Sequence, residues 1–177
     1  MKVILLMALT VDGKIGRSAD HFPDWTGSED KRMFKSVTQR AGAVIMGSRT
    51  FDTIGKPLPG RKNIVLTRNK ARVSQWENLK FTDQTPHDLV ADLKADGFSE
   101  VVLAGGATIN YLFATAGLID EIHVTFTPLI FGTGLPLFSG QVSMALELMK
   151  MQRLGDHQIL AQYRVMRIDV PDSPNRS

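Results

Sequence analysis

The sequence contains no cysteine, and this absence removes several kinds of chemistry. Disulfide bonds, thiolate metal sites and a cysteine nucleophile are all excluded. The four histidines, His21, His87, His123 and His157, lack the spacing of a metal-ligand motif. We therefore predict that the protein holds no metal. The absence of cysteine also fits a reducing compartment, and we expect a cytoplasmic location.

Long apolar runs and dense clusters of one charge are missing as well. No run approaches the roughly 20 residues of a membrane span. The start, "MKVILLMALTVDG", has no signal-peptide cleavage site and is typical of a strand. The formal net charge is only +3, and no Lys/Arg run is interleaved with aromatic residues. We therefore expect neither a membrane nor a nucleic acid as partner.

The composition that remains is that of an ordinary globular protein. The chain has 177 residues, of which 43% are hydrophobic and 22% charged. Such a length suggests one domain with a sizeable core, which we predict over residues 1–168. Residues 169–177, "DVPDSPNRS", show no apolar periodicity and are predicted to be a disordered tail.

Apolar patterning predicts alternating strands and helices. Predicted strands cover residues 3–11, 43–46, 62–66, 79–82, 101–104, 119–127, 146–153 and 159–166. Predicted helices cover about 26–41, 50–54, 86–95 and 107–116, and a Gly/Pro-rich loop covers 128–142. This order predicts an α/β fold with helices on both faces of a mostly parallel sheet of about eight strands. The last two strands form an antiparallel edge.

Two strand-to-helix corners are candidates for binding an anion. In "VVLAGGATIN", Gly105 and Gly106 join a buried strand to a helix, whose first N–H groups are free to bind a phosphate. In "VIMGSRTFDTIGKPLPGRKNIVLT", Gly47 follows a buried strand in the same way. The alternative at either corner is a tight turn that needs glycine for steric reasons alone.

Asp30 and Arg61 are candidates for contacting a substrate. Asp30 lies one helical turn before Phe34, so the two share a helix face and Asp30 is expected to be partly buried. Arg61 follows the rigid loop of residues 55–60 and offers a planar set of donors suited to a carboxylate. The alternatives are an exposed acid in the first turn of a helix and a surface arginine. The residues alone therefore indicate an enzyme-like α/β domain and no particular substrate.

Longer segments of the chain resemble the dihydrofolate reductase family. The segment "VIMGSRTFDTIGKPLPGRKNIVLT" is similar almost residue for residue to a long motif of that family. The segments "MALTVDGKIG", "DWTGSEDKRMFK" and "VVLAGGATINYLF" are similar to its first strand, its acidic helix and its Gly-Gly helix. The resemblance covers about residues 1–125 in the family's order. It implies the family's three-layer αβα fold and hydride transfer from NADPH to C6 of 7,8-dihydrofolate.

The resemblance also implies roles for individual residues. Asp30 would anchor and polarise the pterin and Thr125 would hydrogen-bond to Asp30, so these two are the predicted catalytic residues. The predicted substrate-binding residues are Ala8, Asp30, Phe34, Ile54, Leu58, Arg61 and Thr125. The predicted cofactor-binding residues are Ala8, Ile15, Gly16, Gly47, Ser48, Arg49, Thr50, Leu66, Thr67, Arg68, Ala104, Gly105, Gly106, Ala107, Thr108 and Ile109. The loop of residues 16–24 would close over the nicotinamide.

The C-terminal third departs from this pattern. The segment "GLIDEIHVTFTPLIFGTGLPLF" resembles the reductase domain of riboflavin biosynthesis, which shares the fold and reduces a ribosylamino-pyrimidine phosphate. Reduction of that pyrimidine, or of another pterin, is therefore the alternative function. A second alternative is a non-catalytic protein that binds a dinucleotide or pterin. We expect a small-molecule substrate and either a monomer or a homodimer.

Overall fold

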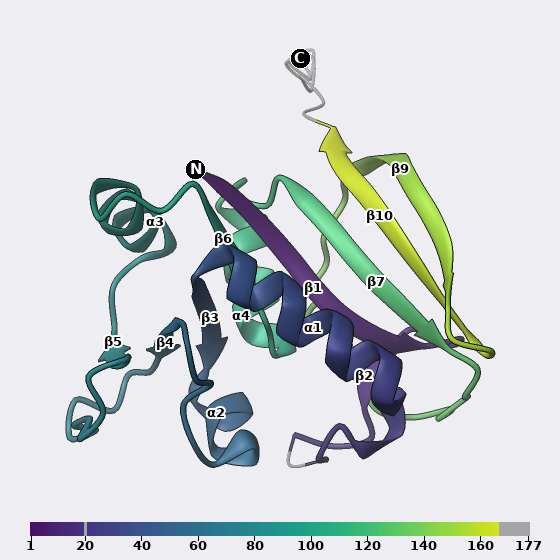
Figure 1. The fold of residues 1–177 in the computed structure, drawn as a ribbon, viewed down its shortest axis with the longest axis horizontal. Coiled ribbons are helices and arrows are strands. Elements are labelled where there is room, and N and C mark those ends of the chain that lie inside the picture. The colour runs from purple at the N-terminus through teal and green to yellow at the C-terminus, as the bar shows by residue number, and fades with distance from the viewer. Residues whose placement is uncertain (20, 167–177) are drawn as a thin grey trace, which may run out of the picture.

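The computed structural model describes residues 1–19 and 21–166, and its centre is an eight-stranded sheet (Figure 1). The strands lie in the order β5-β4-β3-β6-β1-β7-β10-β9. Their bounds are β1 (Lys2–Thr10), β3 (Ala43–Gly47), β4 (Lys62–Leu66), β5 (Leu79–Thr82), β6 (Glu100–Leu103), β7 (Glu121–Thr127), β9 (Ala145–Leu154) and β10 (Gln158–Met166). A separate two-stranded sheet pairs β2 (Lys14–Gly16) with β8 (Leu135–Pro136).

The aliphatic run at the N-terminus forms the middle of the sheet. β1 pairs in parallel with β6 on one side and with β7 on the other. Val3, Ile4, Leu5 and Leu6 are each at most 2% exposed, because both faces of the strand are covered. The hairpin of β9 and β10 closes the sheet in the antiparallel sense, with β10 against β7.

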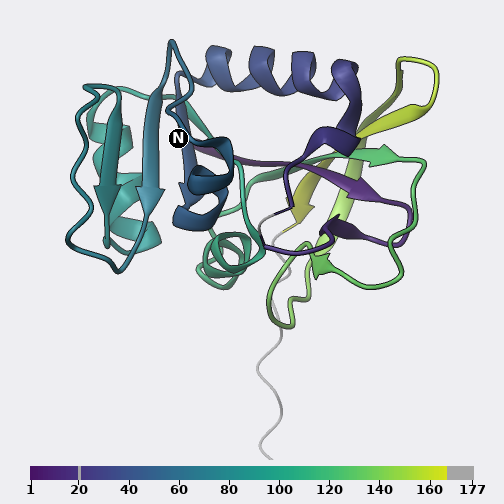
Figure 2. The same cartoon turned by 90° about the horizontal axis from the view of Figure 1, so that it is seen from below.

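Helices cover both faces of the sheet (Figure 2). α1 (Gly27–Ala41) lies on one face, where Met33, Phe34 and Val37 contact Leu6 and Val102. α3 (Pro86–Ala95) and α4 (Ala107–Thr115) contribute buried leucine, isoleucine and phenylalanine side chains to the core on the opposite face. The short α2 (Ser48–Ile54) follows β3, and a 3-10 turn, η1 (Asp24–Thr26), precedes α1. The three-layer αβα architecture is therefore confirmed.

Most predicted elements match the structure to within two residues. β4, β5 and α3 have the predicted bounds, and Thr85 caps α3 by accepting a hydrogen bond from the Asp88 N–H. β7 begins at Glu121 instead of residue 119. At Asp120 the side chain, and not the backbone, accepts a hydrogen bond from the Val3 N–H of β1, at 2.8 Å. The prediction missed β2 and β8: β2 lies between the predicted first strand and the loop of residues 16–24, and β8 lies in the loop predicted over 128–142.

Two further predictions concern the C-terminal tail and membrane-spanning helices. The predicted tail of residues 169–177 lies outside the described residues. Within residues 1–19 and 21–166, no helix is both long and apolar enough to cross a membrane.

Candidate active site

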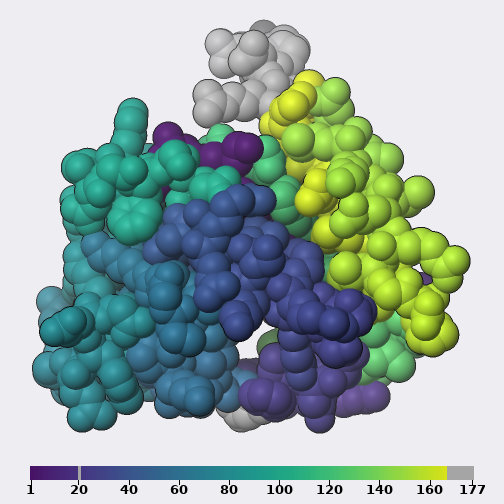
Figure 3. All heavy atoms as spheres, in the orientation of Figure 1, coloured from purple at the N-terminus to yellow at the C-terminus, as the bar shows by residue number. Residues whose placement is uncertain are grey.

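A cleft of about 1050 Å³ opens beside the carboxyl ends of β1, β3, β4 and β6. This end of a parallel sheet is where open α/β folds bind their ligands. The space-filling view shows the surface hollowed between α2 and the N-terminal segment that leads into α1 (Figure 3). The cleft therefore lies between the two regions in which sequence patterns predicted substrate and cofactor residues.

Asp30 lines this cleft from the first turn of α1. It is only 8% exposed, because Phe34 and the sheet lie against that face of the helix. Burial raises the pKa of the Asp30 carboxyl above its ordinary value, and the neighbouring hydroxyls of Thr125 and Thr26 offset part of that rise. A carboxyl group held in an apolar wall of a cleft is a strong candidate for a ligand anchor.

Thr125 lies on β7 close to the Asp30 carboxyl, but it does not line the cleft. Its side chain is fully buried, and its Oγ1 lacks a hydrogen bond of full geometry within the described residues. The hydroxyl nevertheless lies near enough to the Asp30 carboxyl to lower its pKa. This arrangement matches the predicted pairing of Asp30 with Thr125 in position, and its catalytic role stays a prediction.

Phe34, Ile54 and Leu58 form an apolar wall at the same end of the cleft. The loop that carries Leu58 is held by Asn63, whose Nδ2 donates to the Leu58 and Arg61 carbonyl oxygens at 2.9 Å. Asn63 Oδ1 in turn accepts a hydrogen bond from the Leu58 N–H at 2.9 Å. The Pro-rich loop therefore owes its shape to one buried side chain as well as to its prolines.

Arg61 is 6% exposed and lies beside this wall without lining the cleft. Its Nε donates to the Pro59 carbonyl at 3.0 Å, and its Nη1 donates to Lys35 O and Thr38 Oγ1. Burial lowers the pKa of the Arg61 guanidinium. No acidic side chain in the described part of the chain forms an ion pair with it. A buried cation without an anionic partner is suited to receive a ligand carboxylate.

The two glycine corners meet at the other end of the cleft. The Gly47 N–H donates to Gly105 O at 2.8 Å, so β3–α2 and β6–α4 are joined directly. A Cβ atom on Gly47 would lie 2.9 Å from Ile109 Cγ1, which leaves no room for a side chain. Neither α2 nor α4 has a side-chain cap at its N-terminus. Their first N–H groups are therefore available to an anion in the cleft.

Most predicted site residues line this one cleft. The predicted residues that do so are Ala8, Ile15, Asp30, Phe34, Gly47, Ser48, Arg49, Thr50, Ile54, Leu58, Leu66, Thr67, Arg68, Ala104, Gly106, Ala107, Thr108 and Ile109. Those that do not are Gly16, Arg61, Gly105 and Thr125. Gly16 and Gly105 are next to lining residues in the chain, and Thr125 lies close to Asp30. The Arg61 side chain bonds to Pro59, Lys35 and Thr38, none of which lines the cleft.

Some lining residues were not among the individually predicted site residues. In the segment before α1, Ser18, His21 and Pro23 belong to the loop of residues 16–24 that was predicted to close over the nicotinamide, whereas Trp25 was not predicted. Leu135, Pro136 and Ser139, from the loop after β7, were not predicted either. The pairing of β2 with β8 brings these two segments together. Phe131 contacts the first of them, with ring centroids 5.2 Å from Trp25 and 5.7 Å from His21. The sequence signal for this approach was Gly134, where a Cβ atom would lie 2.5 Å from Gly16 O.

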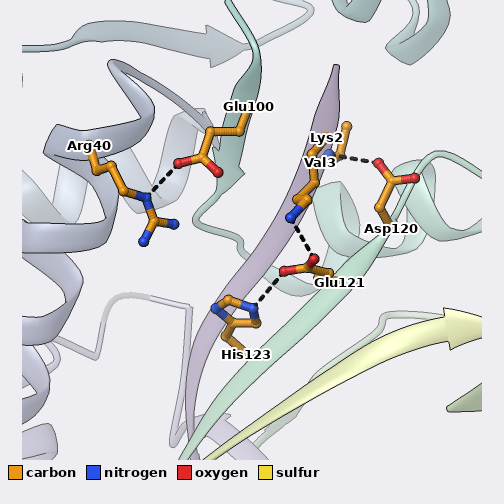
Figure 4. A network of polar contacts seen from close by, with 7 residues as sticks. All are labelled: Lys2, Val3, Arg40, Glu100, Asp120, Glu121 and His123. Carbon is orange, nitrogen blue, oxygen red and sulfur yellow. Dashed lines mark hydrogen bonds and ion pairs between the residues drawn. The ribbon is translucent and has the colours of Figure 1, made fainter. Parts of the chain in front are cut away.

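A second polar cluster lies on the sheet away from the cleft (Figure 4). Glu121 accepts from Lys2 Nζ at 2.7 Å and contacts His123 Nε2 at 3.0 Å. Burial lowers the pKa of His123, and the Glu121 carboxylate opposes this effect only in part. The cluster ties the start of β1 to β7, and none of these three residues lines the cleft. We assign it a structural role.

The fold and the cleft together define an α/β domain of the dihydrofolate reductase kind. The family model of the RibD C-terminal domain matches residues 1–160. The chain belongs to this family of reductases, whose fold is that of dihydrofolate reductase.

Two of the curated relatives are dihydrofolate reductases. Dihydrofolate reductase of Bacillus subtilis (strain 168) is 40% identical over 127 residues, which cover 70% of this chain and 71% of the relative. Dihydrofolate reductase type 3 of Salmonella typhimurium is 36% identical over 126 residues, or 71% and 72% of the two chains.

Among solved structures, a protein assigned to riboflavin biosynthesis in Shewanella sp. PV-4 has a TM-score of 0.80 at 27% identity. The match covers 94% of this chain and all of that one.

Proposed function

We propose that the protein is an NADPH-dependent dihydrofolate reductase, which reduces 7,8-dihydrofolate to 5,6,7,8-tetrahydrofolate. The observation that carries the proposal is the buried Asp30 carboxyl, which lines the same cleft as both glycine corners. The dihydrofolate reductases that are 36% and 40% identical to the chain support it further.

The residues present fit a dinucleotide cofactor at the glycine end. The uncapped N-termini of α2 and α4 suit its phosphates, and Gly47 and Gly106 let those phosphates approach the backbone. When bound, NADPH would supply the hydride for the reduction. Ala8 and Ile15, which line the middle of the cleft, would separate the cofactor end from the Asp30 end.

At the substrate end, Asp30 would accept hydrogen bonds from the amino-pyrimidine edge of the pterin, and Phe34 would contact the ring. Ile54 and Leu58 would surround the benzoyl group, and Arg61 would bind the glutamate carboxylate. Reduction adds a hydride to C6 and a proton to N5. Among residues 1–19 and 21–166, Asp30 is the only carboxyl that lines the cleft at the Phe34 end, and it would polarise the ring while water delivers the proton.

The preference for NADPH over NADH is expected to depend on Arg49 and Arg68. Both are exposed residues that line the cleft, and neither forms an ion pair within residues 1–19 and 21–166. Replacing both with alanine should weaken NADPH binding by about tenfold or more, since phosphate contacts by arginine are strong charge-assisted hydrogen bonds. NADH binding should change by less than about twofold. Fluorescence titration with each nucleotide measures both constants, and equal losses for the two would contradict the assignment.

A second candidate function is reduction of a ribosylamino-pyrimidine phosphate. It is favoured by the family model, which matches residues 1–160, and by the full coverage of the Shewanella riboflavin protein. The test is the loss of NADPH absorbance with purified protein and either substrate. Oxidation of NADPH by dihydrofolate, but not by the pyrimidine, supports the first proposal. The reverse pattern would establish the second, and binding of NADPH without oxidation by either would indicate a non-catalytic protein.

A further inference from the structure

The helix that carries Asp30 begins without the usual side-chain cap. Thr26 precedes α1, but its hydroxyl accepts no hydrogen bond from the first turn of the helix. Its backbone oxygen instead accepts a hydrogen bond from Gln158 Nε2 at 2.7 Å. Gln158 is the first residue of β10 and is 8% exposed. The start of α1 is therefore held by a side chain 132 residues away in the sequence.

The same amide group also binds β7. Gln158 Nε2 donates to Thr127 Oγ1 at 3.0 Å, so both of its donor hydrogens have partners. Thr127 and Thr125 are two residues apart and lie on the same face of β7. Asp30 lies about one helical turn after Thr26. One buried amide thus joins the two elements that place Asp30 opposite Thr125.

The C-terminal hairpin touches the start of α1 at two further points. Gly27 has a φ of 77°, and a Cβ atom there would lie 3.6 Å from Gln158 Oε1. In the turn between β9 and β10, a Cβ atom on Gly155 would lie 2.8 Å from Glu29 Cγ. The hairpin therefore fits closely against the first turn of α1, and Gln158 supplies the hydrogen bond to Thr26 in that contact.

We propose that Gln158 is a positioning residue for Asp30. By bonding to Thr26 and Thr127, it fixes the first turn of α1 against β7 and keeps the Asp30 carboxyl buried in the wall of the cleft. Gln158 does not line the cleft, so it acts through these two partners. The inference rests on the proposed function only in naming the substrate that Asp30 binds.

Gln158→Leu tests the inference, because leucine fills much of the same space and donates no hydrogen bond. We expect kcat/KM for dihydrofolate to fall about tenfold, chiefly through a higher KM, since two buried acceptors lose their donor. The dissociation constant for NADPH should stay within about twofold, since the glycine corners are not touched. Carboxyl ¹³C NMR should show the pKa of Asp30 moving toward its ordinary value as water reaches the loosened turn.

Gln152→Leu is the matched control. Gln152 lies in β9 of the same hairpin and makes no side-chain hydrogen bond within the described residues, so all three readouts should stay at wild-type values. An unchanged KM and an unchanged Asp30 titration in Gln158→Leu would overturn the inference. An equal loss of NADPH affinity would also overturn it, because it would indicate a general structural effect. If Gln158→Leu does not fold, Thr127→Val removes one of the two contacts and is judged by the same readouts.

The NMR titration also separates this inference from the proposed function. It needs no substrate, so it reports on Gln158 even if the wild-type protein does not reduce dihydrofolate. In that case a shifted Asp30 titration would keep the inference while the proposed substrate is rejected.

Discussion

Asp30→Asn is expected to lower kcat for dihydrofolate by about 10²-fold or more, the usual range for losing a group that assists proton transfer. An asparagine amide carries no charge, and it presents a donor where the pterin edge needs acceptors. NADPH affinity should remain close to that of the wild type, because the glycine corners lie at the other end of the cleft. The measurement combines steady-state kinetics with a fluorescence titration of NADPH.

The same substitution is expected to raise the melting temperature at neutral pH. Burial raises the pKa of Asp30 in the folded protein above its ordinary value of 3.8, so the folded state binds this proton more tightly than the unfolded state. Stability is therefore lost as the pH rises from about 3.8 through the raised pKa, and the full penalty is present above that raised pKa. Asparagine does not ionise and avoids this penalty. The advantage of the variant should shrink as the pH falls toward 4.

Asp24→Asn is the control for both effects. Asp24 is an exposed acid in η1, six positions before Asp30, and its loss should change neither kcat nor the melting curve. Full activity in Asp30→Asn would remove Asp30 from the mechanism. A melting temperature that fell at pH 7 would contradict the desolvation argument, even if activity were lost.

Arg61→Met is expected to raise KM for dihydrofolate by about 10²-fold, because a charge-assisted pair with the substrate carboxylate would be lost. KM for a pterin without the glutamate tail should not change, and this contrast separates substrate recognition from damage to the fold. Arg61 also bonds to Pro59, Lys35 and Thr38, so a modest fall in melting temperature should accompany the change.

Arg40→Met provides the comparison for Arg61. Arg40 is an exposed arginine near the end of α1, where its Nε bonds to Glu100 at 2.7 Å (Figure 4). Its replacement removes a positive charge from α1, the helix to which Arg61 also bonds. Arg40 does not line the cleft, so KM should stay unchanged. If both pterins lost affinity equally in Arg61→Met, Arg61 would be a structural residue.

Local patterns were sufficient to predict the main elements, and the family resemblance supplied the site residues. Thr85 and Pro86 mark the start of α3. The face shared by Asp30 and Phe34 indicated partial burial of Asp30 with an exposed acid as the alternative, and the structure shows it 8% exposed. The glycine corners could be located because a strand, glycine and a helix follow one another directly. In each case the information lies within a few neighbouring residues.

The rest depends on contacts between distant segments. Pro136 reaches the cleft because β8 pairs with β2, and neither strand has a periodic pattern. Ser139 reaches it because its N–H donates to Ala107 O at the start of α4. Gln158 resembles any polar residue at the start of a strand, and its role depends on α1 and β7 meeting there. Arg61 was predicted from a motif, but its distance from the cleft lining depends on how Asn63 folds the loop.

The pairing of β1 also has a consequence for how the chain folds as it is synthesised. β1 is made well before its neighbours, because β6 and β7 begin only at Glu100 and Glu121. The nascent chain must therefore keep an aliphatic segment without its partners until most of the protein has left the ribosome. Because the bond between Thr26 and Gln158 spans 132 positions, the Asp30 end of the cleft is completed last. A chain that stops before β10 would be expected to leave the outer edge of β7 unpaired, and therefore to aggregate or be degraded.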